Sequence, residues 1–289
     1  MYLSPPTRDP VDDYERTITR RRSEGVSLVL QGARNAVLAA YNGYANAAAD
    51  PTAYSSVIKD KVIAKVLREN YDLVQESRIL SDLREEILEA AFINKCALCG
   101  FGEVGSLDHY LPKNRYPEYS ILPYNLLPAC GVCNLKKLQE VGDTEGGRFL
   151  HSYLDRFESV GPLITCEITT SGEELVIKYA PRDSLPEKVK RIVRYHFKGL
   201  DLQERYTTAS LDRILGVYDL LEEAYHDEGP AGVAYEAKRR ETNCQNKFGN
   251  QYWEVALYRG MQISEDFCNK GFELVRKHGP DGPTLWLCN

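Results

Sequence analysis

An aspartate and a histidine are adjacent at Asp108 and His109, and two asparagines, Asn125 and Asn134, follow sixteen and twenty-five residues after the histidine. An imidazole can take a proton from water, and a carboxylate can bind a cation that stabilises negative charge on a phosphate. Hydrolysis of a phosphodiester bond needs both groups at one place. The pattern therefore favours a phosphodiesterase site in which His109 is the base.

Two Cys-x-x-Cys pairs enclose this segment, Cys96 with Cys99 and Cys130 with Cys133. Two such pairs about thirty residues apart are typical of a tetrahedral zinc site. A thioredoxin-type redox pair is the alternative, but two pairs around one short segment favour zinc. Because four thiolates leave no open coordination position, we predict a structural Zn²⁺ that takes no part in hydrolysis.

Each residue of the predicted site also has a simpler interpretation. A single histidine in a loop is more often structural than catalytic, Asp108 could be a solvated turn residue, and Asn134 could cap a helix. These interpretations explain the residues singly but not their occurrence together. A zinc module without catalytic activity, which binds nucleic acid or protein, stays open as the rival hypothesis.

The segments 107–113 (LDHYLPK) and 123–137 (PYNLLPACGVCNLKK) resemble an HNH endonuclease of the ββα-metal superfamily. The resemblance is to the variant of this family whose motif opens with Asp-His and lies inside a four-cysteine zinc site. The resemblance implies that Asp108 binds a catalytic divalent ion, His109 is the general base, Asn125 braces the loop, and Asn134 completes the metal site. Asn125 and Asn134 could exchange these roles.

The same resemblance implies two short strands, near 104–110 and 126–128, and a helix that starts near Cys133. An asparagine at the last motif position, in place of the more usual histidine, favours Mg²⁺ or Mn²⁺ as the catalytic ion, because both prefer oxygen ligands. Asp108 and His109 are adjacent, so both can serve one site only where the first strand ends or bends.

A fainter resemblance covers residues 149–155, which include His151. They are similar to the region that follows the HNH core in prokaryotic proteins, among them nuclease subunits of anti-phage systems such as Septu. This implies a role in anti-phage defence and an ATPase or another defence-system protein as partner. For His151 itself we favour a structural role over phosphate binding.

Four cations flank the predicted site and form a candidate clamp for the scissile phosphate: Lys113, Arg115, Lys136 and Lys137. A second cationic stripe, Lys190, Arg194 and Lys198, recurs every four residues and is equally well explained as a solvated helix face. The net charge of −6 argues against binding of nucleic acid by bulk electrostatics. DNA is the expected substrate, and the sequence does not separate it from RNA or tRNA.

Apolar spacing predicts an α+β fold that is predominantly helical, with the small zinc-stapled module between helical flanking regions. We expect an N-terminal helical region (1–90), the nuclease module (91–158) and a C-terminal region (159–289) that begins with a β-hairpin. The hairpin strands are expected at 163–169 and 174–179, and helices follow from Pro186. The Gly- and Pro-rich segment 279–283 is expected to end the last helix.

The chain of 289 residues is 43% hydrophobic and 27% charged, which is typical of a globular protein. No apolar run approaches the roughly 18 to 20 residues that cross a bilayer. The first residues lack a basic segment followed by an apolar one, so we expect no secretory signal and a reducing, cytoplasmic location. The remaining cysteines are expected to be small buried hydrophobes: Cys166, Cys244, Cys268 and Cys288.

Overall fold

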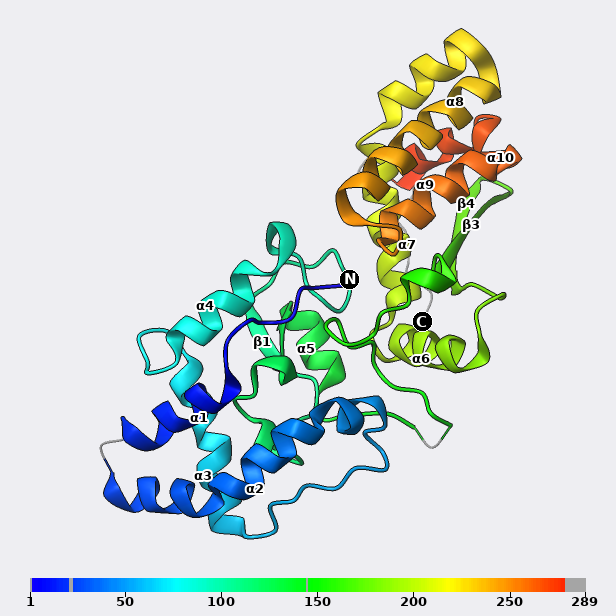
Figure 1. The fold of residues 1–289 in the computed structure, drawn as a ribbon. Coiled ribbons are helices and arrows are strands. Elements are labelled where there is room, and N and C mark those ends of the chain that lie inside the picture. Colours follow the sequence, from blue (N-terminus) through cyan, green and yellow to red (C-terminus); the bar gives the residue numbers. More distant parts are fainter. Residues whose placement is uncertain (1, 21–22, 144, 279–289) are drawn as a thin grey trace. The chain divides into compact units, whose positions relative to one another are not determined.

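The computed structural model describes residues 2–20, 23–143 and 145–278, and the chain divides into two compact units. The first contains Met1–Arg156 and Arg191–Leu200, and the second contains Phe157–Lys190 and Asp201–Asn289. In the described residues, helices predominate and two small antiparallel sheets have two strands each (Figure 1). The predicted α+β class is confirmed.

Four α-helices build the N-terminal part of the first unit: α1 (Pro10–Thr19), α2 (Glu24–Ala49), α3 (Lys61–Glu69) and α4 (Ser81–Glu89). The carboxylates of Asp9 and Asp60 accept hydrogen bonds from the first backbone N–H groups of α1 and α3, so each helix begins at a capped position. Helix α2 ends directly before Asp50 and Pro51. Short 3₁₀ turns lie at Asn70–Val74, Phe92–Asn94, Pro117–Tyr119 and Pro123–Asn125.

These helices pack around the two strands of the small module rather than around a core of their own. One buried apolar cluster contains residues of α1 to α4 together with Leu107 and Leu126, which belong to the two strands. The predicted helical region and the predicted zinc module thus lie in one unit and share a core. Burial of this core is what positions the site residues on the strands.

The module itself has the order strand, strand, helix. Strand β1 (Ser106–His109) pairs antiparallel with β2 (Leu126–Ala129), and α5 (Gly131–Lys137) follows at once. The register places His109 opposite Leu126. Both strands lie where the sequence predicted them, although β1 is shorter, and α5 begins two residues before the predicted start.

The second unit contains the predicted hairpin, β3 (Ile164–Ser171) with β4 (Glu174–Pro181), after a turn at Glu158–Val160. Helix α6 (Glu187–Gly199) begins where expected after Pro186, and its residues from Arg191 onward belong to the first unit. The remaining helical elements are α7 (Leu202–Leu215), α8 (Tyr218–Phe248, interrupted at Gly229), α9 (Trp253–Ile263), α10 (Glu265–Cys268) and a 3₁₀ turn (Gly271–His278).

Side chains cover the outer edges of this hairpin. Gln203 and Thr207 of α7 bond the backbone of Ile177 on β4, and Ser264 donates to the carbonyl of Ile168 on β3. Gly260 lets α9 approach β3 closely, because an added Cβ would lie 2.5 Å from the carbonyl oxygen of Cys166. Covered edges cannot pair with another strand.

Three of the scattered cysteines, Cys166, Cys244 and Cys268, are buried as predicted, and Cys288 lies outside the described residues. The predicted helix end at 279–283 also falls outside them. In the described part of the chain, no helix combines the length and the apolarity that crossing a membrane requires.

Candidate active site and metal centre

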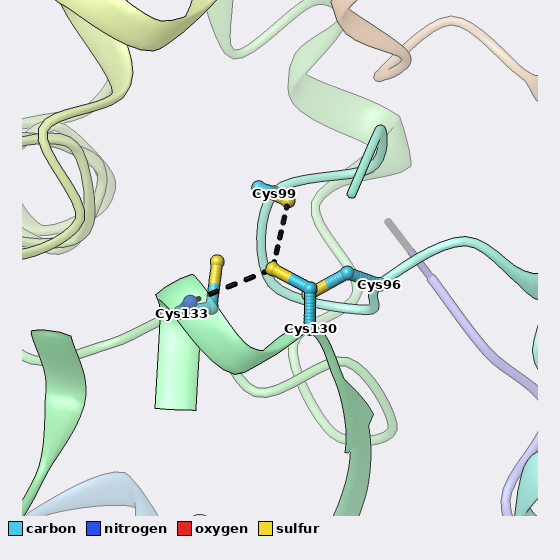
Figure 2. A group of neighbouring side chains, drawn as sticks. All are labelled: Cys96, Cys99, Cys130 and Cys133. Atoms are coloured by element: carbon cyan, nitrogen blue, oxygen red, sulfur yellow. Dashed lines mark hydrogen bonds between the residues drawn. The ribbon is translucent and has the colours of Figure 1, made fainter. Parts of the chain in front are cut away.

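The four predicted cysteines converge. Figure 2 shows Cys96 and Cys99 facing Cys130 and Cys133, and all four sulfur atoms lie within 4.8 Å of one another in a buried position. The Sγ atoms of Cys99 and Cys130 are 3.9 Å apart. This donor set and spacing can hold a metal ion such as Zn²⁺.

Local backbone geometry explains why the sulfurs meet. The thiol of Cys130 accepts a hydrogen bond from the backbone N–H of Cys133 at 3.4 Å, so the second pair also forms the first turn of α5. The first pair turns back at Gly102, whose N–H donates to Cys99 Sγ at 3.3 Å. A side chain at Gly102 would put its Cβ 2.7 Å from Cys130 Sγ, so only glycine leaves room for the cluster.

Asp108 lies one residue before the end of β1 and is buried, with only 5% of the residue exposed. Its Oδ2 atom is 3.1 Å from Nζ of Lys137, which is an ion pair by distance. No described residue gives that oxygen a hydrogen bond of correct geometry. Burial raises the pKa of Asp108, and the Lys137 charge partly opposes the rise.

His109 ends β1 and is buried, with its ring centroid 4.4 Å from that of Tyr71. Its Nε2 atom lies 2.9 Å from the backbone oxygen of Ser120. A carbonyl can only accept, so Nε2 must carry the proton and Nδ1 must hold the lone pair. Burial lowers the pKa of His109 to about 3, which keeps the imidazole neutral at neutral pH and weakens it as a base in the absence of substrate.

Helix α5 lies along β1, and two of its residues contact the strand. Asn134 donates from Nδ2 to the hydroxyl of Ser106 at 3.1 Å, and one helical turn later Lys137 reaches Asp108. Ser106 and Asp108 are two residues apart and so share one face of the strand. The amide of Asn134 therefore lies on the same strand face as the carboxylate of Asp108.

The sequence predicted Lys137 as one of four cations that flank the scissile phosphate, but the structure does not place it at the surface. It is fully buried, and its ammonium donates to the backbone oxygen of His109 at 2.6 Å as well as pairing with Asp108. It ties α5 to the last two residues of β1. The i, i+3 spacing from Asn134 was the signal in the sequence that both residues share one helix face.

Asn125 is the centre of a buried hydrogen-bond network. Its Nδ2 donates to the carbonyls of Leu111 and Tyr119, both at 3.0 Å, and its Oδ1 accepts from the Leu111 N–H at 2.7 Å. Tyr44 of α2 also donates to Oδ1, at 3.0 Å, and its hydroxyl lies 2.9 Å from Nε2 of His151. These bonds fix the loop that follows His109, including the turn that carries Ser120.

The other predicted cations remain nearer the surface. Lys113 is half-buried with its ammonium 4.4 Å from the centre of the Tyr71 ring, and burial lowers its pKa. Arg115 and Lys136 are exposed. Lys113 contacts the same tyrosine ring as His109, so of these three cations it is the one with a described contact near the histidine.

The sequence did not identify Tyr44 as a residue of the site, and it predicted no hydrogen-bond partner for His151. Neither belongs to a recognisable local motif, and Tyr44 is 81 residues from Asn125 in the chain. His151 is buried among tyrosines, and its Nδ1 accepts the backbone N–H of Tyr153 at 3.3 Å. The structural role favoured for His151 agrees with these contacts.

Comparison with known proteins gives one distant relationship. The chain is 27% identical over 188 residues to protein ea31 of Escherichia phage lambda. The match covers 60% of this chain and 63% of the relative, so it spans less than two thirds of that protein. No family model matches the chain, and no solved structure matches it.

The four-cysteine cluster predicts an outcome for single substitutions. Cys130→Ser should lower the zinc content of the purified protein from about one ion per chain, because three thiolates and a hydroxyl bind zinc weakly. Cys244→Ser, which changes a buried cysteine of the second unit, is the matched control and should keep the zinc. Metal analysis of both variants decides, and equal zinc content in the two would contradict the assignment of the ligands.

The buried imidazole of His151 predicts a pH dependence of stability. Burial holds the pKa of His151 at about 3, against an opposing attraction from Asp155, whereas the unfolded value is about 6.5. Because the unfolded chain then binds the proton more readily, stability is complete above pH 6.5 and falls on acidification toward pH 3. The contribution is up to about 1.4 kcal/mol per pH unit.

Chemical denaturation of the wild type and of His151→Gln between pH 7 and pH 5 measures this contribution. The variant should lose less stability than the wild type on acidification, while His226→Gln, at an exposed histidine, should keep the wild-type slope. Parallel curves for all three proteins would refute a neutral, buried His151.

Proposed function

We propose that this chain is a metal-dependent endonuclease of the HNH type that hydrolyses phosphodiester bonds in DNA. The observation that carries the proposal is the state of His109. Its Nε2–H is held by the Ser120 carbonyl, so a neutral Nδ1 is left as the base, and the preceding strand residue, Asp108, carries a buried carboxylate.

In the proposed reaction Nδ1 of His109 accepts a proton from water as the water oxygen forms a bond to phosphorus. The bond from phosphorus to the leaving sugar oxygen breaks, and that oxygen takes up a proton from solvent. The Ser120 carbonyl keeps the ring oriented and stabilises the imidazolium that results. A phosphate beside His109 would raise the pKa of the imidazole from about 3, which makes it a stronger base when substrate is bound.

The oxygen donors of Asp108 and Asn134 fit a hard divalent cation. Asp108 offers a buried carboxylate oxygen without a well-oriented hydrogen bond, and the amide oxygen of Asn134 is a second oxygen donor from the same strand face. When bound there, Mg²⁺ or Mn²⁺ would supply positive charge that stabilises the phosphate and the leaving oxygen. The ammonium of Lys137 lies 3.1 Å from that same oxygen, Oδ2, and a bound cation would share the charge of the carboxylate with it.

The two metals would then have separate tasks. Zn²⁺ at the four cysteines would fix α5 on the strands, and the second ion would assist cleavage. RNA is the alternative substrate, because the same base and cation could hydrolyse it. A partner such as an ATPase, and a role in anti-phage defence, remain proposals that rest on the resemblance alone.

Replacement of His109 by alanine tests the proposal. In Mg²⁺, the wild type should nick supercoiled plasmid, and His109→Ala should do so about 10² to 10⁴ times more slowly, as expected when a general base is removed. His226→Ala, which changes an exposed histidine, should keep the wild-type rate.

Zinc content and thermal unfolding show whether each variant is folded. Nicking at the wild-type rate by a zinc-loaded His109→Ala protein would refute His109 as the base. A wild type that leaves plasmid intact but cleaves a single-stranded RNA, with the same dependence on His109, would replace DNA by RNA as the substrate.

A further inference from the structure

Helix α6 carries a concentration of positive charge that the proposed site does not use. Its thirteen residues contain five lysines and arginines and a single acidic residue, in a chain with a net charge of −6. Arg191, Arg194 and Lys198 are all exposed. At 100° per residue these three positions fall within an arc of about 60°, so they form one stripe on the outer face.

None of these three cations makes an ion pair with a carboxylate among the residues that the structure describes. Other exposed cations do: Lys238 pairs with Glu241, and Arg239 pairs with Glu236. A salt-bridged surface of that kind serves solubility and stability. Three unpaired cations in one stripe repel one another, which is a cost unless an anion binds there.

The opposite face of α6 is anchored to the zinc module. His196 is buried, its Nε2 lies 2.8 Å from the carbonyl oxygen of Leu98, and its Nδ1 accepts the backbone N–H of Leu150 at 3.2 Å. Leu98 lies between Cys96 and Cys99 in the chain. A carbonyl only accepts, so one neutral tautomer of His196, protonated at Nε2, satisfies both bonds.

Ring contacts continue from α6 to the proposed active site. Phe149 packs edge-on against Tyr195, with centroids 5.2 Å apart, and the ammonium of Lys137 lies 5.9 Å from the centre of the same Phe149 ring. Gly199 leaves the room for Phe149, since an added Cβ would lie 2.9 Å from its ring. The helix that carries the cationic stripe thus packs, through Phe149, in the same unit of the structure as Asp108 and His109.

We propose that the outer face of α6, with Arg191, Arg194 and Lys198, binds the phosphate backbone of the nucleic acid that is cleaved at His109. The inference rests on the proposed function and names a binding surface for it. Cations at this spacing lie along about 10 Å of helix, which spans several consecutive phosphates of a duplex. An acidic protein would be the other ligand for such a stripe, but packing in the same unit as the proposed phosphodiesterase site favours a polyanionic substrate.

The test measures binding without cleavage, in the full-length, zinc-loaded His109→Ala protein. A second variant adds Arg191→Gln, Arg194→Gln and Lys198→Gln. The matched control instead adds Lys178→Gln, Lys247→Gln and Lys270→Gln, which removes the same charge from exposed positions of the second unit. The affinity of each protein for a fluorescent 30-base-pair duplex is measured at several salt concentrations.

The α6 variant should bind at least about tenfold more weakly than the control, and the slope of log affinity against log salt should fall by about 2 to 3, one phosphate contact for each cation. Equal affinities and slopes for the α6 variant and the control would overturn the inference, as would a parent protein that does not bind the duplex at low salt.

Cleavage by the protein with an intact His109 is assayed separately, so the two proposals can fail independently. Binding that depends on α6 in a protein that never nicks DNA would keep the binding surface and refute the nuclease. If the wild type nicks DNA but the α6 variant binds the duplex as tightly as the control, the nuclease proposal stands and the binding surface on α6 is refuted.

Discussion

The convergence of four cysteine sulfurs within 4.8 Å is the constraint on which the rest of the site depends. Two of them belong to a tight turn and two to the start of α5, which is only seven residues long. A helix of that length is not stable alone in water. Its position therefore comes from the cluster at one end and from the buried Lys137 at the other.

From that position α5 determines what surrounds Asp108 and His109. Asn134 directly follows Cys133, and Lys137 lies one turn further, so both reach the strand face that carries Asp108. A metal at the cysteines would thus act on the active site only through backbone geometry. Four thiolates would fill the coordination shell of such an ion, so it would shape the proposed site without taking part in hydrolysis.

A second constraint acts on the loop after His109. Asn125 is completely buried and satisfies its amide with four hydrogen bonds, three of them to backbone groups of the loop and one to Tyr44 of α2. Buried polar groups are costly unless they are fully bonded, so such a network admits one loop conformation. Through it the long helix α2 and the segment around His151 contribute to the position of the Ser120 carbonyl that orients His109.

Local patterns in the sequence were enough to predict the strands, the hairpin and the convergence of the four cysteines, because each depends on residues close together in the chain or on a strict spacing. They could not predict the partner of Asp108, since Lys137 looked like any other lysine near a basic site and only its burial distinguishes it. Tyr44 was beyond reach for a different reason, because its contact with Asn125 depends on how α2 packs against the module. The amphipathic pattern of the N-terminal helices indicated their existence but not that the strands of the module would share their core.

We propose two different metal ions at two separate sites, zinc at the cysteines and a catalytic divalent ion at Asp108. Both can be located by anomalous X-ray diffraction from crystals of the zinc-loaded protein soaked in Mn²⁺, recorded at the zinc and manganese edges. We expect a manganese peak within bonding distance of the Asp108 carboxylate and a zinc peak among the sulfurs of Cys96, Cys99, Cys130 and Cys133. Manganese found only among the cysteines, or absent from Asp108 at saturating concentration, would contradict this proposal.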